Sequence, residues 1–473
     1  MSRRWGAISS PDDPVDGDDA DEAVGDGGES VDAVDGTTAD TATSDAASAI
    51  EQYAGDTKHA WYRQYAEDHL VHLIVILAFA AYPGVYTLLV NSGLSAEVTA
   101  LLPRIETLVV VLFFALFAMS FDFISGYTGY LSFGHAAFYG TGAYLVALAA
   151  NGKIPLIGPE TPFMLLLVLA GVAAAVLALA IGSVSFRLSG VYFAMITLGF
   201  SQVLYVFVRD WDFVSSAPRD GVAVTGTFEG FRIGVPGVDG LSVAIGQLTG
   251  DSIEGLFGFI NLSPTEVSFY AIGAVVLVCY LAMQRLVHSP FGRTLIAIRE
   301  NEERARAIGY NTYAYKLGAF VASGFFAGIA GALFAGFRRS VTPENGFYFL
   351  VAGDELLVSI IGGFGTLAGP LYGELFDATV REFLSKEGGG GGLLPYLRAN
   401  VGDATLATEI YNGLTVAEAI DTFLNGHAAL YVGLLFVLFV LYVPNGLLGT
   451  ARDRMGGTLA KAVPRRLRRW FDG

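Results

Sequence analysis

Hydrophobic residues along the chain fall into long, nearly uncharged runs that short polar segments separate. Apolar runs of about 18 or more residues are typical of transmembrane helices. Eight such runs predict spans near His69–Val90, Ile105–Ile124, Phe133–Ala150, Pro162–Phe186, Val191–Val208, Glu266–Val287, Tyr315–Phe337 and Ala428–Leu447. The sequence therefore predicts an all-α, polytopic membrane protein.

A ninth apolar stretch, Phe349–Phe376, is interrupted by the sequence GGFGTLAGP at Gly362–Pro370. Glycine and proline at this density break a helix. Irregular backbone is tolerated at membrane depth only where protein buries it or where it lines a water-filled cavity. We therefore expect this stretch to enter the membrane and return to the same side, as a re-entrant segment.

Basic residues concentrate in two segments, residues 288–312 and residues 451–473. Lysine and arginine in short loops stay on the cytoplasmic side, so both segments are expected inside. Two predicted spans then separate them, which agrees with a re-entrant ninth stretch. The same count places the N-terminus inside and the loop 211–265 outside; Arg338 and Arg339 would then face outward, against the charge rule.

The composition agrees with a membrane protein, because 53% of the residues are hydrophobic and the mean hydropathy is +0.52. The net charge of −17 comes mostly from residues 1–64, which hold 15 acidic residues against four basic ones. Such a segment buries little apolar surface, so we expect a disordered acidic cytoplasmic tail. Such a tail would keep the protein solvated in the salt-rich cytoplasm of a halophilic organism. The alternative is that it is an arm that binds a partner. The membrane domain then covers residues 65–450.

The sequence gives little evidence of catalytic residues or of a metal site. Cys279 is the one cysteine, and the six histidines show no metal-ligand spacing. No Gly-x-x-x-x-Gly-Lys phosphate loop occurs, so any nucleotide chemistry has to come from another chain. We expect no catalytic residue, no metal, no cofactor bound by this chain and no nucleic-acid partner.

Two glycine-rich stretches resemble each other. In GYTGYLSFG, Gly126 and Gly129 have the same spacing as Gly362 and Gly365 in GGFGTLAG. This indicates an internal repeat, and transporters often build a midplane solute site from broken helices in paired repeats. Close helix packing through small residues is the alternative explanation.

Four longer motifs occur in a fixed order: SGYTGYLSFGHAAFYGTGAYLVAL, GVYFAMITLGFSQVL, SPFGRTLIAIRENEERARAIGYNTYAYKLGAFVASGFFAGIAGALFA and IGGFGTLAGPLYG. They resemble the permease subunits of branched-chain amino acid ABC importers, of the LivM type. The resemblance implies a multi-pass protein of the cell membrane that transports amino acids. It also implies a second permease subunit, two ATPase subunits that bind ATP and Mg, and an extracellular solute-binding protein.

The resemblance also gives a role to the charged segment 288–312. ABC permeases dock a short cytoplasmic helix onto the ATPase, and Glu303, Ala305 and Gly309 match its pattern, beside Arg299 and Glu300. The i, i+4 pairs Glu300–Arg304 and Glu302–Arg306 favour an exposed helix. Its apolar edge, offered to the partner, would comprise Leu295, Ile298, Ala305 and Ile308. A solvated connector is the alternative.

Residues of the glycine stretches and ionisable residues within spans are candidates for the transport pathway. The candidates are Gly126, Gly129, Ser132, Gly134, His135, Glu355, Gly362, Gly363, Gly365 and Gly369. His135 could instead hold a helix start by a hydrogen bond, and Glu355 could cap a helix. We expect Asp122, Asp354 and Glu374 to be solvated near the membrane interfaces.

The substrate stays open at this level, because relatives of this kind move branched-chain amino acids, other amino acids, urea or short amides. An ion-coupled secondary transporter that uses the buried acids is an alternative from another class, although it would not need the charged cytoplasmic helix. A membrane enzyme is a weaker alternative, because no nucleophile and base occur together.

Overall fold

A computed structural model of the chain describes residues 76–90, 102–225, 231–234, 242–256, 260–385, 401–411, 414–424, 428–443 and 446–450. Residues 64–473 form one compact unit. The predicted tails 1–64 and 451–473 lie outside the described residues, as do residues 386–400 with the five-glycine run.

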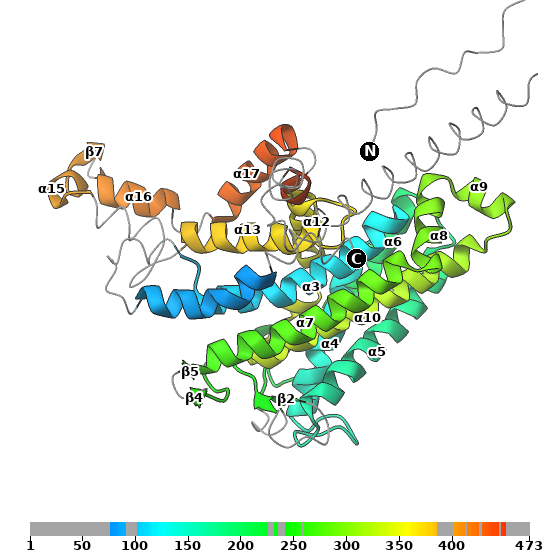
Figure 1. Cartoon of the computed structure of the whole chain (residues 1–473), viewed down its shortest axis with the longest axis horizontal. Coiled ribbons are helices and arrows are strands. Elements are labelled where there is room, and N and C mark those ends of the chain that lie inside the picture. Colours follow the sequence, from blue (N-terminus) through cyan, green and yellow to red (C-terminus); the bar gives the residue numbers. More distant parts are fainter. Residues whose placement is uncertain are drawn as a thin grey trace, which may run out of the picture. The chain divides into compact units, whose positions relative to one another are not determined.

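Helices make up most of the described chain (Figure 1). The helices after Ile76–Val90 are α3 (Ile105–Thr128), α4 (His135–Ala150), α5 (Phe163–Ser185), α6 (Val191–Arg209), α7 (Pro264–His288), α8 (Pro290–Glu300), α9 (Glu302–Ala307), α10 (Thr312–Arg338), α11 (Pro343–Gly346), α12 (Phe349–Gly362), α13 (Gly369–Ser385), α15 (Asp403–Leu406), α16 (Val416–Leu424) and α17 (Ala428–Tyr442). The chain is thus the predicted all-α, multi-pass membrane protein.

Six helical segments among the described residues are long and apolar enough to cross a membrane. Five of them, α3, α5, α6, α7 and α10, confirm predicted spans, and the sixth combines α11 with α12. The prediction of eight spans is not confirmed. The segment predicted as Phe133–Ala150 is the 16-residue α4, and the described parts of the first and last spans are Ile76–Val90 and Leu430–Tyr442, both of which are shorter than a span.

The core lies around α3, α4, α5 and α10, which pack closely against one another. Small residues allow this approach. A Cβ atom at Gly331 of α10 would collide with the carbonyl of Tyr139 in α4, and one at Gly142 would collide with the carbonyl of Gly328. Without a hydrophobic driving force between helices in lipid, such backbone contact is a main source of helix association. Side chains of α4 are therefore buried on nearly every face.

Short strands form in the loops between the helices, and six of them, β1 to β6, lie at one end of the bundle. The strands are β1 (Val222–Ala223), β2 (Arg232–Ile233), β3 (Val243–Ala244), β4 (Ile253–Leu256), β5 (Ile260–Leu262), β6 (Ser340–Val341), β7 (Glu409–Tyr411) and β8 (Leu414–Thr415). β1 pairs antiparallel with β6, so the loop after α6 is tied to the end of α10. We call this end, with β1 to β6, the strand end.

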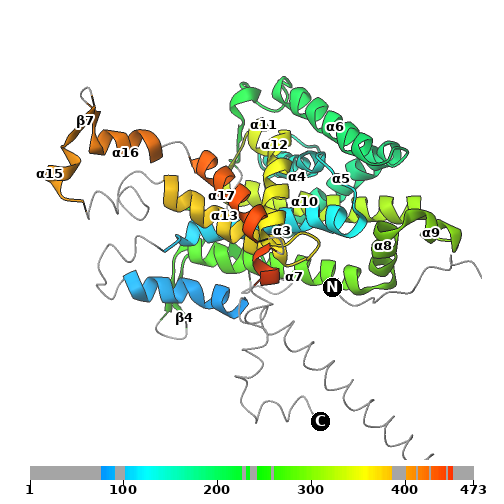
Figure 2. The same cartoon turned by 90° about the horizontal axis from the view of Figure 1, so that it is seen from above.

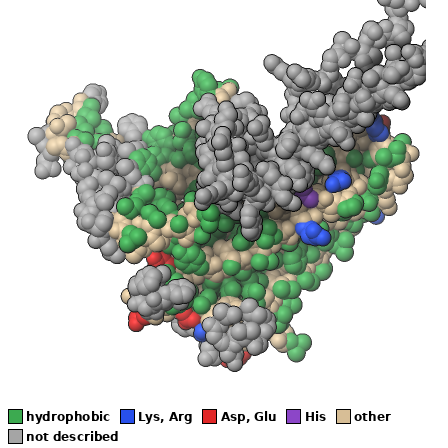
Figure 3. Space-filling view, in the orientation of Figure 1, with side chains coloured by type: hydrophobic (Ala, Val, Ile, Leu, Met, Phe, Trp, Pro, Cys, Tyr) green, Lys and Arg blue, Asp and Glu red, His purple; other side chains and the backbone are tan. Residues whose placement is uncertain are grey.

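The opposite end carries α8 and α9, and we call it the α8–α9 end. Figure 3 shows Lys and Arg side chains near α8 and α9, and Asp and Glu side chains toward the strand end, with hydrophobic surface between them. The exposed side chains of α5 and α6 are mostly apolar. Such a band of surface is suited to lipid or to another apolar helix.

The broken stretch forms a helical hairpin, in which α12 and α13 pack on each other and on α3 (Figure 2). At one end Phe347, just before α12, accepts a hydrogen bond from Ser201 of α6 through its carbonyl at 2.9 Å. Glu382, near the end of α13, accepts one from the backbone N–H of Arg104, just before α3. Arg104 precedes α3 at the strand end, so the end of α13 lies there, whereas Ser201 places the start of α12 beside the middle of α6. The predicted helix break at Gly362–Pro370 is thus present, and the re-entrant path of the stretch stays a prediction.

Candidate functional site

The two glycine stretches form turns between consecutive helices, and these turns meet at the α8–α9 end. Gly129 closes α3 with φ of 77°, and Gly365 lies in the α12–α13 turn with φ of 79°. The carboxylate of Asp122 accepts a hydrogen bond of 2.8 Å from the backbone N–H of Gly365. The hydroxyl of Tyr127 accepts one of 3.2 Å from the N–H of Leu367. Backbone groups of the turn are thus satisfied by side chains of α3, as burial requires.

Glycine is needed where these backbones touch. A Cβ atom on Gly126 would lie 2.8 Å from the Cα atom of Gly365 and 2.6 Å from a carboxylate oxygen of Asp122. Within the hairpin, a Cβ atom on Gly362 would collide with the carbonyl of Gly369. Helix packing through small residues, the alternative considered above, therefore describes the local structure of both stretches.

Arg299 of α8 brings the predicted coupling segment into contact with both turns. Its guanidinium donates a hydrogen bond to the carbonyl of Gly126. Its side chain also lies 3.3 Å from where a Cβ atom of Gly129 would be, and its Nη1 atom lies 3.3 Å from the corresponding position at Gly365. Arg299, predicted for coupling, thus contacts three of the glycines predicted for the pathway.

The charged segment is two helices rather than one, and this corrects the predicted surface. Asn301 has extended φ and ψ angles of −161° and 101° and caps α9 by accepting a hydrogen bond from the N–H of Arg304. Because the helix breaks there, Glu300 and Arg304 are not an i, i+4 pair on a single helix. The pair between Glu302 and Arg306 is present at 3.1 Å.

The predicted apolar edge was wrong for three of its four members. Leu295, Ile298 and Ala305 are 0–3% exposed and pack on this chain's own bundle, and only Ile308 is exposed. The residues left at the surface include Glu300, Glu303 and Gly309. Gly309 has φ of 95°, with no atom within 4 Å of where a Cβ atom would lie.

Below α9, Glu302 is held by four donors. Its carboxylate accepts hydrogen bonds from Lys316 at 2.7 Å, from Thr312 and Tyr130 at 3.0 Å, and from Arg306 at 3.1 Å. Lys316 is 4% exposed, and its ammonium lies 4.5 Å from the ring centre of Tyr130. Partial burial of Glu302 raises its pKa. A larger opposite effect comes from the hydrogen bonds of Lys316, Thr312 and Tyr130 and from the charge of Lys316, so the pKa of Glu302 lies below its ordinary value.

His135, at the start of α4, is fully buried. Its Nε2 atom lies 2.5 Å from the Ser323 hydroxyl, which in turn donates to the carbonyl of Ser120. The rings of Phe121, Phe138 and Phe320 meet it edge to face. This environment favours the structural role, a hydrogen bond that holds the helix start. Ser132 and Gly134 are also buried beside it, and a Cβ atom at Gly134 would press on the carbonyl of Thr197 in α6.

The hairpin buries acidic residues midway along its length. Glu355 of α12 is 3% exposed, and Glu374 of α13 is 6% exposed. The expectation that Glu374 and Asp122 are solvated was wrong: Asp122 has no exposed surface, because its carboxylate binds the hairpin turn. Asp354 is exposed, as expected. Arg381 makes an ion pair of 2.6 Å with Asp377.

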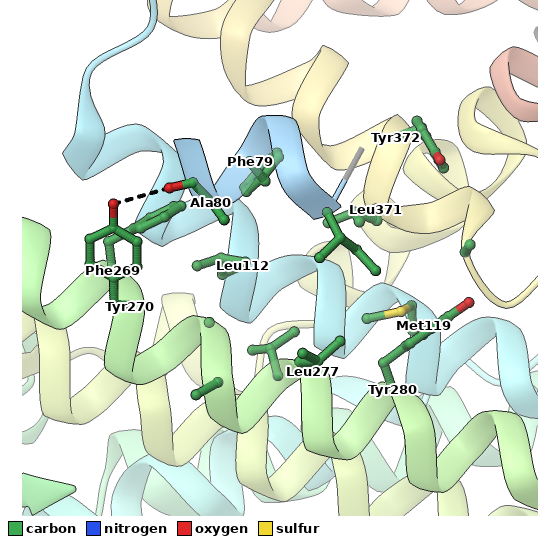
Figure 4. Close-up of a pocket in the computed structure, with 15 residues that line it drawn as sticks. Phe79, Ala80, Leu112, Met119, Phe269, Tyr270, Leu277, Tyr280, Leu371 and Tyr372 are labelled. Carbon is green, nitrogen blue, oxygen red and sulfur yellow. Dashed lines mark hydrogen bonds between the residues drawn. The ribbon is translucent and has the colours of Figure 1, made fainter. Parts of the chain in front are cut away.

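No group of three or more His, Cys, Asp or Glu residues in the described chain could hold a metal ion. A cavity of about 280 Å³ lies between the helix Ile76–Val90, α3, α7 and α13. Figure 4 shows its lining, which includes Phe79, Leu112, Met119, Leu277 and Leu371. With no charged side chain in the lining, this cavity suits apolar groups rather than a charged solute.

The Glu302 network generates a stability prediction. We expect Glu302→Gln to lower the free energy of unfolding by about 1–3 kcal/mol at neutral pH, because Lys316 then loses its charged partner. The lowered pKa of Glu302 means that this contribution is complete above the usual glutamate pKa and is lost as the pH falls through the pKa of the folded state. Thermal unfolding of the purified protein across this pH range measures both effects.

Glu303→Gln, one residue along and fully at the surface, is the matched control and should change stability by less than about 0.5 kcal/mol. Equal destabilisation by the two substitutions, or a Glu302→Gln difference that grows on acidification, would contradict the network.

Comparison with known proteins agrees with this geometry. Residues 104–386, more than half of the chain, match the family model described as branched-chain amino acid transport system / permease component. The chain is 27% identical over 285 residues to the high-affinity branched-chain amino acid transport system permease protein LivM of Salmonella typhimurium, and equally to that of Escherichia coli. These matches cover 59% of this chain and 63% of each relative.

A shorter match, 31% identical over 131 residues, is to the autoinducer 2 import system permease protein LsrC of Photorhabdus laumondii and covers 27% of this chain and 37% of that protein. No solved structure matches the chain. The glycine turns, the hairpin and α8–α9 all lie within the residues that the family model covers, and the chain belongs to the family of permease components of branched-chain amino acid transport systems.

Proposed function

We propose that this chain is a transmembrane permease subunit of an ATP-driven importer for branched-chain or related amino acids. A second permease subunit would complete the solute pathway, two ATPase subunits would bind ATP and Mg, and an extracellular binding protein would deliver the solute. One observation carries the proposal: Arg299 of the exposed, charged helix pair α8–α9 donates a hydrogen bond to Gly126 and packs against Gly365, so it contacts both glycine stretches.

Movement at α8–α9 would reach the pathway directly. A force on α9 acts on α8, and Arg299 connects α8 with Gly126 and Gly365. Within the hairpin, the α12–α13 turn is the part that Arg299 contacts, so a movement of α8 would act on this turn. The flanking helices α7 and α10 would carry the same movement along the bundle.

ATP drives such a change only if the ATPases bind one conformation of the permease better than the other. Reversing a population ratio of 99:1 needs about 5.5 kcal/mol of differential binding. The exposed surface of α8–α9, with Glu300, Glu303 and Gly309, is where that difference in binding would be made. Ala305, although part of the predicted docking pattern, is buried and would support the surface from below.

In this proposal the α8–α9 end and both termini face the cytoplasm, and the strand end faces outward. The exposed apolar side chains of α6, such as Val191, Met195 and Val203, would contact lipid or the second permease. Arg338 and Arg339 would then lie on the outer side; the Arg339 guanidinium is 3.9 Å from the centre of the Phe231 ring, within the loop structure.

An ion-coupled carrier is the second candidate, because Glu355 and Glu374 are buried within the hairpin. Such a carrier would need neither ATPases nor an exposed docking helix. The same ABC architecture could also import urea or short amides, since fold does not fix the solute.

Docking at α8–α9 can be tested by substitution. We expect Glu303→Lys and Gly309→Val to lower ATPase copurification and ATP-driven amino acid uptake at least tenfold, equivalent to about 1.4 kcal/mol of binding. Charge reversal alters the surface offered to the partner, and valine strains a backbone with φ of 95°. Glu254→Lys, an exposed acid at the strand end, is the control for copurification.

Vesicles that contain the permeases without the ATPases complete this experiment. They should show no uptake, whereas uptake driven there by an ion gradient would favour the carrier. If both variants bind the ATPases and transport fully, α8–α9 is a solvated connector and not a docking surface.

Orientation is tested by labelling with a membrane-impermeant thiol reagent. A cysteine that replaces Ser252, an exposed residue just before β4, should react from outside intact cells. A cysteine that replaces Ala307, an exposed residue in α9, should react only after the membrane is opened. The native Cys279 is buried and gives little background. Labelling of both positions from the same side would contradict the proposed topology.

A further inference from the structure

The acidic residues of the hairpin form a cluster with more negative than positive groups. Glu355 of α12 lies within electrostatic range of Glu374, Asp377 and Asp354, and of the basic Arg381. Arg381 makes its ion pair with Asp377 at 2.6 Å. Buried carboxylates are costly unless they are paired, so the cluster is suited to a further positive group.

A second, independent observation lies around Glu355. Among the described residues, its Oε2 atom, the hydroxyl of Ser359 and the hydroxyl of Tyr139 are buried and have no hydrogen-bond partner. Ser359 lies one helical turn after Glu355 and on the same face of α12. Tyr139 comes from α4, and its hydroxyl lies within electrostatic range of Glu355 and Glu374. Leaving such buried groups without a partner is unfavourable, and a ligand that binds them removes this cost.

The chemistry of these three oxygens selects the ligand. All three oxygens can accept hydrogen bonds, and one of them belongs to the carboxylate of Glu355. A primary ammonium group matches this set, because it offers one positive charge and three donors. A metal ion is a poorer fit, because no group of three His, Cys, Asp or Glu residues in the described chain converges closely enough to hold one.

The position along the hairpin suits a solute passing through the bundle. Glu355 lies seven residues before the glycine turn, about halfway along α12, and the helices on both sides of it continue toward the strand end. Asp354, its exposed neighbour, offers a first carboxylate at the surface of the isolated chain.

We propose that Glu355, Ser359 and Tyr139 form a binding site for the primary ammonium group of the transported amino acid. This inference rests on the proposed import of amino acids and names the part of the solute that this chain contacts. The side chain and the carboxylate of the solute would be left to other residues or to the second permease.

The test measures binding to the assembled permease–ATPase complex without the solute-binding protein. Radiolabelled leucine is the probe, and the competitors are leucine methyl ester, which keeps the ammonium, and N-acetylleucine, which lacks it. We expect Glu355→Gln to weaken leucine binding at least tenfold and Tyr139→Phe to weaken it several-fold. The ester should compete and N-acetylleucine should not. Glu344→Gln, an exposed acid of α11, should bind like the unaltered complex.

Copurification of the ATPases reports whether each variant assembles. If Glu355→Gln fails to assemble, Tyr139→Phe, which removes a single oxygen, decides the question. Unchanged leucine binding in an assembled Glu355→Gln or Tyr139→Phe complex would overturn the site, as would equal competition by N-acetylleucine, or an unaltered complex that binds neither leucine nor its ester.

Uptake by the unaltered complex with its binding protein separates this inference from the proposed function. One possible result is that the unaltered complex takes up leucine and that Glu355→Gln does not change leucine binding. This result would overturn the ammonium site but leave the importer function intact. Absence of any amino acid uptake would contradict the importer, whereas binding of the methyl ester that is lost in Glu355→Gln would still support the ammonium site.

Discussion

The hydrogen bond from Arg299 to the carbonyl of Gly126, beside the bond from the Gly365 N–H to Asp122, is the interaction on which the rest of the structure depends. It joins three segments that are far apart in the sequence: the end of α3, the turn of the α12–α13 hairpin, and α8. Each contact exists because glycine lets a backbone come within van der Waals distance of its neighbour. Side chains at Gly126 or Gly362 would separate the turns and leave their polar groups without partners.

This arrangement also explains how irregular backbone is tolerated within a membrane protein. The turn between α12 and α13 leaves helix-terminal backbone groups that lipid cannot satisfy. Asp122 and Tyr127 accept hydrogen bonds from two of its N–H groups, and the hairpin packs on α3 rather than on lipid. Asp122 and Tyr127 thus hold the turn on α3, next to the place where Arg299 of α8 contacts Gly126 and Gly365.

Much of this organisation could be predicted from local sequence. The apolar runs predicted five long helices, the GGFGTLAGP stretch predicted a break between two helices, and the charges of residues 288–312 predicted an exposed helical segment. The apolar edge Leu295, Ile298 and Ala305 could not be assigned correctly, because an amphipathic helix looks the same whether its apolar face meets a partner or its own bundle. Asp122 was misjudged for a related reason: its partner Gly365 lies 243 residues away. The unpartnered hydroxyls of Tyr139 and Ser359 become visible only once α4 and α12 are placed together, although the i, i+4 spacing of Glu355 and Ser359 was a signal in the sequence.

The central claim is that Arg299 transmits movement of α8–α9 to the glycine turns. The most direct measurement is the number of amino acid molecules transported per ATP hydrolysed by the complete transporter in proteoliposomes, for Arg299→Met and for Arg293→Met, an exposed arginine earlier on α8. The account predicts that Arg299→Met assembles and hydrolyses ATP but transports at least tenfold fewer molecules per ATP, whereas Arg293→Met keeps the unaltered ratio. An unaltered ratio in Arg299→Met would contradict it.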